Sequence, residues 1–211
     1  KVQYEGDATI SGVPGAAAPI PLAFRDTAGS SCGALLPTGN GVDEINGIQV
    51  TMIDNGMPCV VIAAADVGIT GYEDRATLDA DTAMKQRVEA IRLKAGLRMN
   101  LGDVTEKSVP KMMLVAAPRD GGAIAVRSLI PHRVHASIGV LGAVSVATAC
   151  LVKGSPAAAV AVVSNGTRKI LGVEHPTGIT ECVVAVDAFD MPVEAGMLRT
   201  ARKLMDGLIF A

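Results

Sequence analysis

The chain has 211 residues, of which 49% are hydrophobic and 19% charged, so it can bury one large core or two modest ones and is not expected to be disordered. Its net charge of -2 provides no basic field for a nucleic acid, and aromatic residues, at 2%, are too few to stack on bases or sugars. The four cysteines lie far apart without a CxxC pair, which is typical of reduced thiols in a cytoplasmic protein.

No segment predicts a membrane span or a signal peptide. The longest apolar stretch, residues 138–152, is shorter than the roughly 20 residues that a span requires. Residues 1–7 are polar and lead into Gly and Pro turns instead of an apolar segment. Because the chain lacks an initiating Met, we expect that it starts inside a longer protein.

The first 40 residues predict two short strands, 3–10 and 20–24, followed by a long loop. The loop, residues 29–40, reads GSSCGALLPTGN, and its glycines and small polar side chains favour close approach of backbone N–H groups to a ligand. A plain connecting loop is the alternative. The candidate binding residues here are Ser30, Ser31 and Cys32, and a thiolate in such a loop would be more reactive than one in a core.

Residues 47–53 and 60–64 predict two strands joined by the turn DNGMP. Asn55 and Gly56 form a strong turn signal, and such a turn leaves an amide and nearby backbone N–H groups at one end of a sheet. The candidate binding residues are Asn55, Gly56 and Met57, although most Asn-Gly turns are only turns.

The middle of the chain predicts an amphipathic helix and a β-hairpin. Residues 78–99 carry apolar side chains at helical spacing, and their charged residues, Arg92 included, read as a solvated face. Residues 111–117 and 123–130 are two strands with turn residues between them. Lys111, which leads into the first of these strands, faces either solvent or the same end of the sheet as the DNGMP turn.

Residues 137–152 predict a helix that is small or apolar on every face, and such a helix belongs inside a layer of other elements. The simplest container is a sheet wrapped around it, built in part from strands at 158–164, 169–173 and 180–186. Residues 193–205 predict an amphipathic helix that ends at Gly207.

The entrance to this buried helix concentrates groups that bind anions. His132, Arg133 and His135 precede its first turn, and Ser137 is a natural N-cap. Free N–H groups, the positive end of the helix dipole and a guanidinium that grips two oxygens together predict a carboxylate site. A metal is the alternative because of the HxxH spacing, but no third ligand follows and Arg133 would repel a cation, so we expect none. His175 reads as a turn residue, or as part of a loop that closes over a ligand.

Six motifs together resemble the PrpF family of isomerases, and within it the 4-oxalomesaconate tautomerases: GSSCGALLPTGN, DNGMP, SVPKM, IPHRVHASIGVLGAVSVATA, EHPTG and LRTARKLMDG. The resemblance implies an α+β, diaminopimelate-epimerase-like fold with two similar domains, each a curled sheet around a central helix. It also implies a cofactor-free 1,3-proton shift in an unsaturated di- or tricarboxylate, as in the degradation of aromatic acids such as gallate. 2-Methylaconitate or 3-methylitaconate isomerisation is the alternative activity, and a non-catalytic carboxylate-binding fragment is the alternative from another class.

By the same resemblance, residues 1–46 would end the first domain, 47–187 would form the second with its central helix at about 137–152, and 188–211 would return to the first as a helix. The family's acid–base Cys, in a CGN motif, and its partner Lys lie earlier than this chain, so an N-terminal portion of the same protein is the expected partner. Cys32 is followed by Gly33 and Ala34, so that role is not transferred to it, and the catalytic residues of this chain stay unassigned. The oligomeric state stays open, a homo-oligomer included.

Overall fold

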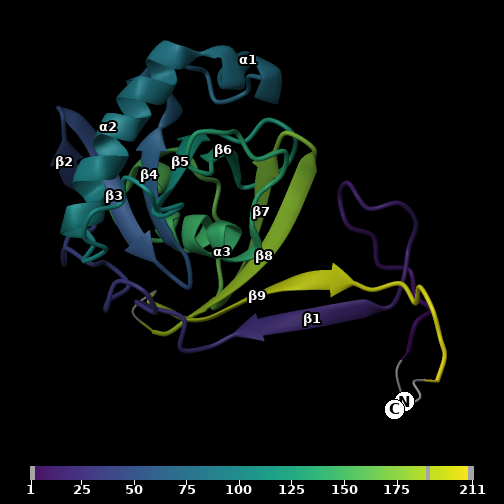
Figure 1. Ribbon diagram of the computed structural model, residues 1–211. Coiled ribbons are helices and arrows are strands. Elements are labelled where there is room, and N and C mark those ends of the chain that lie inside the picture. Colours follow the sequence, from purple (N-terminus) through teal and green to yellow (C-terminus); the bar gives the residue numbers. More distant parts are fainter. Residues whose placement is uncertain (1–2, 189–190, 209–211) are drawn as a thin grey trace.

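The computed structural model describes residues 3–188 and 191–208, and its strands form one curled, nine-stranded sheet in the order β1-β9-β8-β7-β6-β5-β4-β3-β2 (Figure 1). Neighbouring strands are antiparallel except for β4 with β5 and β6 with β7. The strands are β1 (Pro19–Phe24), β2 (Asp43–Ile45), β3 (Ile48–Asp54), β4 (Pro58–Ala63), β5 (Lys111–Ala116), β6 (Ile124–Leu129), β7 (Arg168–His175), β8 (Gly178–Val186) and β9 (Pro192–Thr200). The helices are the 3-10 helix η1 (Ala64–Val67), α1 (Arg75–Ala80), α2 (Thr82–Arg98), α3 (Val140–Ala149) and α4 (Pro156–Val160).

Helix α3 lies inside the curl of the sheet, and its residues from Gly142 to Ala149 are all buried (Figure 1). The inner face of the sheet supplies alternate residues of strands β4 to β9 to this core, among them Val61, Met113 and Val184. A Cβ at Gly142 would stand 2.9 Å from the end of the Met113 side chain, so a small residue there lets α3 approach the sheet. The expected α+β fold with a sheet wrapped around an apolar helix is confirmed.

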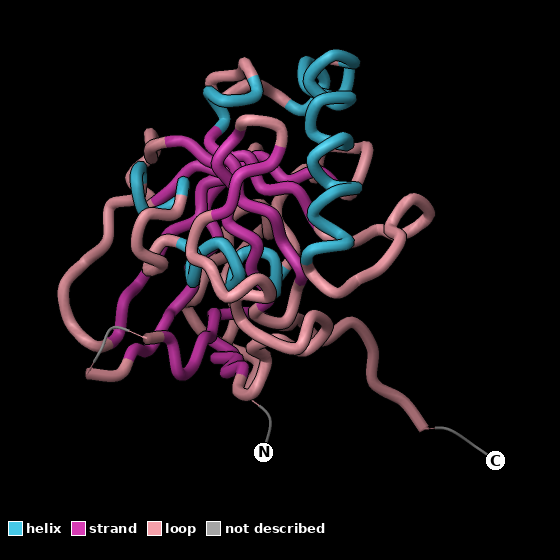
Figure 2. The backbone as a smooth tube through the Cα atoms, turned by 90° about the vertical axis from the view of Figure 1, so that its left-hand side faces the viewer, coloured by secondary structure: helices cyan, strands magenta, loops and turns pink. Residues whose placement is uncertain are grey.

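Helix α2 covers the outer face of the same strands, as the long helix beside the sheet in Figure 2 shows. The intervening residues of β4 and β5, such as Val60 and Met112, form a second core with the apolar stripe of α2. Burying a stripe residue such as Ile91 stabilises the fold by about 2 kcal/mol. The apolar face predicted within residues 78–99 is therefore confirmed, and its buried members on α2 are Met84, Val88, Ile91 and Ala95.

The helix predicted over 78–99 is divided in two at Asp81, which has non-helical backbone angles and caps α2 by accepting a hydrogen bond from Met84 N. The strand predicted over 3–10 is wrong, because the structure has only an isolated bridge between Ala8 and Ala17 there. Most of that segment is exposed, so no core fixes it as a strand.

Two predictions in the C-terminal half are wrong. Residues 158–164 are not a strand, because Ser155 caps α4 by accepting from Ala158 N at 2.9 Å and Pro156 begins that helix. Residues 193–205 are not a helix: β9 pairs with both β8 and β1, and alternate residues Ala195 and Met197 are buried. Pairing with strands far apart in the sequence has overridden the helical spacing.

The structure also bears on the predicted domain ranges. Strands β1 and β2, from the range 1–46, and β9, from the range 188–211, join the same sheet as the strands of 47–187. The division into domains stays a prediction, but the helix expected over 188–211 is absent from residues 188 and 191–208, and the rest of that range lies outside the described residues. Within the described residues, no helix combines the length and the apolar character that crossing a membrane requires.

Candidate functional site

One end of the curled sheet brings together segments that are distant in the sequence. Strands β3 and β6 end there, and β4 and β5 begin there, as the pairing registers show. Residues 130–139 connect β6 to α3 at this end. Part of this connection runs back along β6: Val134 forms a bridge with Leu129, and His135 N donates to Ser128 O at 2.8 Å. It therefore occupies the space beside β6 beyond the end of β7, and meets the hairpin between β7 and β8.

Four side chains form a hydrogen-bonded network at this meeting point. Ser137 Oγ lies 3.2 Å from His175 Nε2, which is 3.0 Å from Thr180 Oγ1. The backbone N–H of Ser137 donates to His135 Nδ1 at 2.9 Å. Ser137 and His135, predicted to lie at the helix entrance, are thus joined to His175 and to the first residues of β8.

The backbone donors fix the proton positions on both rings. Thr177 N donates to His175 Nδ1 at 3.3 Å, as Ser137 N does to His135 Nδ1. Because an amide N–H can only donate, both Nδ1 atoms are acceptors and each neutral ring carries its proton on Nε2. His175 therefore donates towards Ser137 and Thr180, while His135 Nε2–H has no acceptor within the described residues.

The surroundings keep both rings neutral. Burial lowers the pKa of His175 to about 4, with smaller contributions from His135 and from nearby arginines, Arg199 among them. Burial also lowers the pKa of His135, followed by the positive charges of Arg75 and Lys111. At neutral pH the network therefore presents uncharged N–H donors.

Lys111 adds the positive charge at this end. It is the first residue of β5 and lies on the same side of the strand as Met113 and Val115, which face α3. Burial lowers the pKa of its half-buried ammonium group, and the charge of Arg92 acts in the same direction. No carboxylate in the parts of the chain that the structure describes pairs with this group. Lys111 therefore lies at the same end of the sheet as the DNGMP turn and is half-buried, and its role in binding stays a prediction.

The N-terminus of α3 differs from the prediction. The helix begins at Val140 and its N-cap is Gly139, which makes no side-chain cap, so the prediction that Ser137 is the N-cap is wrong, as is an end at residue 152. The first bond within the helix runs from Ala143 N to Gly139 O at 2.8 Å, which leaves the N–H groups of residues 140–142 unbonded within the helix. These groups supply the positive end of the helix dipole.

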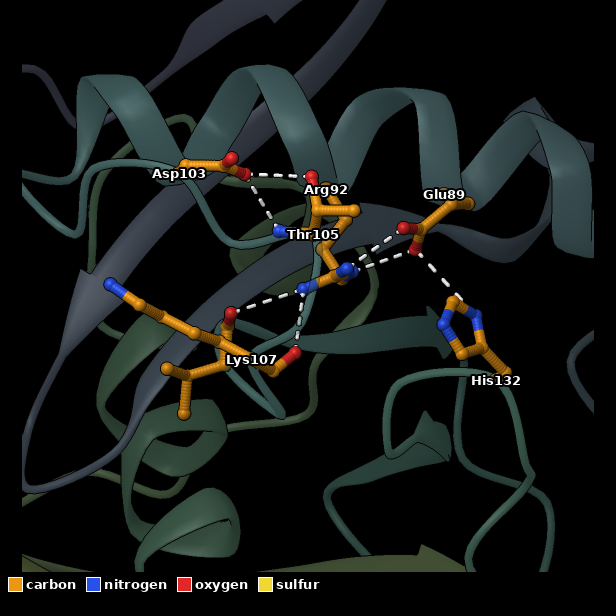
Figure 3. A network of polar contacts seen from close by, with 7 residues as sticks. Glu89, Arg92, Asp103, Thr105, Lys107 and His132 are labelled. Atoms are coloured by element: carbon orange, nitrogen blue, oxygen red, sulfur yellow. Dashed lines mark hydrogen bonds and ion pairs between the residues drawn. The ribbon is translucent and has the colours of Figure 1, made fainter.

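His132 and Arg133 do not join the network. Both are exposed, and His132 Nδ1 lies 3.8 Å from Glu89 Oε2 on α2 (Figure 3). Next to them Val134 N donates to Asp79 Oδ1 at 2.8 Å. The predicted cluster of four is therefore divided: His135 and Ser137 approach α3, while His132 faces the outer helices.

The turn after β3 holds α3 in place. Asn55 Oδ1 accepts from Thr27 Oγ1 at 2.6 Å, and Asn55 Nδ2 donates to Thr148 Oγ1 at 2.9 Å. Ser145 Oγ accepts from Asn55 N and donates to Met57 O, at 3.2 and 2.8 Å. A Cβ at Gly56 would stand 3.1 Å from Leu141, so the turn packs directly on the first turn of α3. The amide of Asn55 is thus occupied by internal hydrogen bonds.

The predicted loop at 29–40 is anchored by Asp54. Ser31 N and Cys32 N each donate to Asp54 Oδ2 at 2.8 Å, and Gly29 N donates to Asp54 O at 2.7 Å. Ser30 and Ser31 are exposed, whereas Cys32 is buried in the outer core. Burial raises the pKa of Cys32 to about 12, so the suggestion of a reactive thiolate is wrong.

The sequence did not single out Thr180 or Arg199. Both lie at inward-facing positions, of β8 and β9, and they line a cavity of about 270 Å³ that also borders the N-terminal loop. The complete lining is Thr9, Ile10, Ser11, Ile179, Thr180, Glu181, Leu198 and Arg199. The predicted helix over 193–205 concealed the alternation of Ala195, Met197 and Arg199, which is the signal that would have revealed it. Among the described residues, no three His, Cys, Asp or Glu side chains are grouped to hold a metal.

The model of the PrpF protein family matches residues 1–211. The chain belongs to the PrpF family. Among relatives, a (4E)-oxalomesaconate Delta-isomerase of Novosphingobium sp. (strain KA1) is 71% identical over 209 residues, 99% of the chain. A 4-oxalomesaconate tautomerase of Pseudomonas putida is 56% identical over 210 residues, also 99% of the chain. In both cases the chain covers 58% of the relative's length.

More distant PrpF relatives carry the names of the alternative activities. A 3-methylitaconate isomerase of Eubacterium barkeri is 30% identical over the whole chain, which spans 61% of that relative. The crystal structure of a methylitaconate-delta-isomerase superposes with a TM-score of 0.89 at 26% identity, covering 98% of this chain and 59% of that one. The resemblance inferred from the motifs is confirmed, and the curled sheet around α3 is a fold shared within the PrpF family.

Proposed function

We propose that this chain is the substrate-gripping part of a cofactor-independent isomerase that performs a 1,3-proton shift in an unsaturated polycarboxylate of the 4-oxalomesaconate type. The names and identities of the two similar relatives support this activity and this substrate. We place the reaction in the degradation of aromatic acids such as gallate, in the cytoplasm, where four unbridged thiols are stable.

The site that carries the proposal is the convergence of Lys111 and the His135–Ser137–His175 network beside the start of α3. Lys111 supplies a positive charge for one carboxylate. The N–H groups at residues 140–142 and His135 Nε2–H supply neutral donors whose direction the fold has already set. Removing a proton from carbon between carbonyl groups creates an enolate, and fixed donors stabilise such an anion more than they stabilise the substrate.

Proton transfer itself requires other residues. All four cysteines are buried, and for each of them burial raises the pKa to about 12, so none is ready to act as a base. The proposed acid and base therefore lie in the N-terminal portion of the protein, which we propose as the partner of this chain. The role of Asn55, Gly56 and Met57 is to hold α3, and Ser30 and Ser31 stay candidates for substrate contact.

An assay of the full-length protein tests this function. Keto-form oxalomesaconate is followed by absorbance, with 2-methylaconitate and 3-methylitaconate in parallel. We expect the largest kcat/KM with oxalomesaconate. Turnover no faster than the uncatalysed background with all three would contradict the assignment. Preference for a methylated substrate would instead support the alternative activity.

The non-catalytic alternative predicts binding without turnover. Isothermal titration of the full-length protein with citrate-like acids measures binding, which both hypotheses predict. The oxalomesaconate assay separates them, because only an isomerase also turns over its unsaturated substrate. The four groups to which we assign binding are Lys111, His135, Ser137 and His175.

A further inference from the structure

Arg92 is a fully buried cation on the face of α2 that the sequence predicts to be solvated. Its Nε and Nη2 donate to the two carboxylate oxygens of Glu89, at 2.7 and 2.8 Å, in a bidentate ion pair (Figure 3). Its Nη1 donates to two backbone carbonyl oxygens, of Lys107 and Val109, each at 3.1 Å. Every nitrogen of the guanidinium is therefore occupied, as a buried charge requires.

The two carbonyls belong to the segment that immediately precedes Lys111. Val109 and Pro110 immediately precede β5, whose first residue is Lys111. Holding the Val109 carbonyl fixes the backbone two residues before the ammonium-bearing side chain, and holding the Lys107 carbonyl fixes the approach of the loop. In Figure 3 Arg92 lies between α2 and this loop.

The other partner of Arg92 reaches the second segment of the site. Glu89 Oε2 lies 3.8 Å from His132 Nδ1, in the connection that continues to His135 and Ser137. The Glu89–Arg92 pair on the outer side of the sheet is therefore hydrogen-bonded to the segment before β5 and lies near the tip of the 130–139 connection.

We propose, on the basis of the function proposed above, that Arg92 is a positioning residue of the polycarboxylate site. Held by Glu89, it fixes the entrance to β5 so that Lys111 meets the substrate. Stability alone is a weak reason for such a pair, because apolar residues of similar volume often stabilise a core as well as a buried ion pair does.

The electrostatic effect of Arg92 on Lys111 also connects these two residues. The positive charge of Arg92 lowers the pKa of Lys111, after burial, which has the larger effect. The other titratable groups that act on this part of the site are Cys59 on β4, which opposes the shift of Lys111, and His135. Neutralising Arg92 is therefore expected to move the alkaline limit of substrate binding to higher pH.

The test compares Arg92→Lys with Arg98→Lys in the full-length protein. Arg98 is on the same helix and also donates to a backbone carbonyl, Glu44 O at 3.0 Å, but it is exposed and contacts no site segment. We expect Arg92→Lys to raise KM for oxalomesaconate about tenfold with kcat changed less than about twofold, since Lys111 binds but does not transfer the proton. Arg98→Lys should change neither constant more than about twofold.

A double-mutant cycle separates positioning from general stabilisation. If Arg92 acts through Lys111, then Arg92→Lys has little further effect on KM in a Lys111→Met background. Equal fold-changes in both backgrounds, or an unchanged KM in a folded Arg92→Lys variant, would overturn the positioning role of Arg92 and leave the proposed function standing.

Should Arg92→Lys fail to fold, Glu89→Gln keeps the side-chain shape and one acceptor oxygen. It is expected to raise KM about threefold, an effect that Lys111→Met again suppresses. Additive changes would overturn the inference. Absence of turnover in the unaltered protein would instead overturn the proposed function and this inference with it.

Discussion

The two histidines of the 130–139 connection have opposite surroundings although only two residues separate them. His132 is exposed and faces the charged Glu89–Arg92 pair on the outer side of the sheet. His135 accepts a backbone hydrogen bond on the inner side and, like His175, has a lowered pKa. Charge therefore fixes the backbone on the outer side of the sheet, while neutral donors and one lysine are presented on the inner side.

The largest expected effect is the loss of that lysine. Lys111→Met should lower kcat/KM for oxalomesaconate about 100-fold, because a charged partner of a carboxylate contributes about 2–3 kcal/mol. Lys107→Met is the matched control, since its ammonium donates to Leu101 O outside the site. Steady-state kinetics on the full-length protein measures both. A loss below about threefold for Lys111→Met would remove Lys111 from the site.

Acid should destabilise the folded protein through His175, on the inner side of the sheet. The pKa of His175 is lowered in the folded state to about 4, so its contribution to stability is complete above the unfolded value near 6.5 and is lost as pH falls towards 4. The expected loss in the free energy of unfolding is about 2 kcal/mol, and urea titrations at pH 7 and 4.5 measure it. His175→Gln should show a smaller loss over that interval. An equal loss in both proteins would mean that His175 is not the group responsible.

The pair of histidines can be compared directly by the same substitution. His135→Phe removes the Nε2–H donor and should lower kcat/KM about tenfold. His132→Phe should change it less than about threefold, because its contact with Glu89 is long and exposed. Equal effects would show that the two sides do not differ in this way.

The smallest effect is expected at Arg133. It is exposed, so Arg133→Ala should raise KM no more than about threefold, and added salt should reduce the difference. Titration of a citrate-like acid at two ionic strengths measures this. A loss of binding of tenfold or more would place Arg133 in direct contact with the substrate.

Local patterns predicted much of the fold. The stripe on α2, the Asn55-Gly56 turn and the apolar character of α3 each follow from short-range spacing, which sequence displays directly. The failures depend on distant partners. Strand β9 is fixed by β1 and β8, and Arg92 is buried because carbonyls from residues 107 and 109 reach it, neither of which helical periodicity reveals.

The sequence predicted the kind of site, an anion site at one end of the sheet, better than it predicted which residues form it. His135, Ser137 and Lys111 do converge at one end of the sheet, because strand ends and hairpin turns are legible in the sequence. The sequence predicts His175 only as a turn residue or as part of a closing loop, because its partners, Ser137 and Thr180, lie on other elements. Their contact depends on residues 134–135 running back along β6, which no local pattern indicates.

Because residues 134–135 run back along β6, the part of this connection that can vary is separated from the part that is fixed. The bridge between Leu129 and Val134 encloses a short tip, residues 130–133, while the segment behind it is locked to the sheet. A tip of different length or different amino-acid composition would therefore leave the donors of His135 and Ser137 where they are. If the proposed function holds, changes in this tip can alter which acid binds without moving these donors, and relatives with different substrates are expected to differ first at residues 130–133.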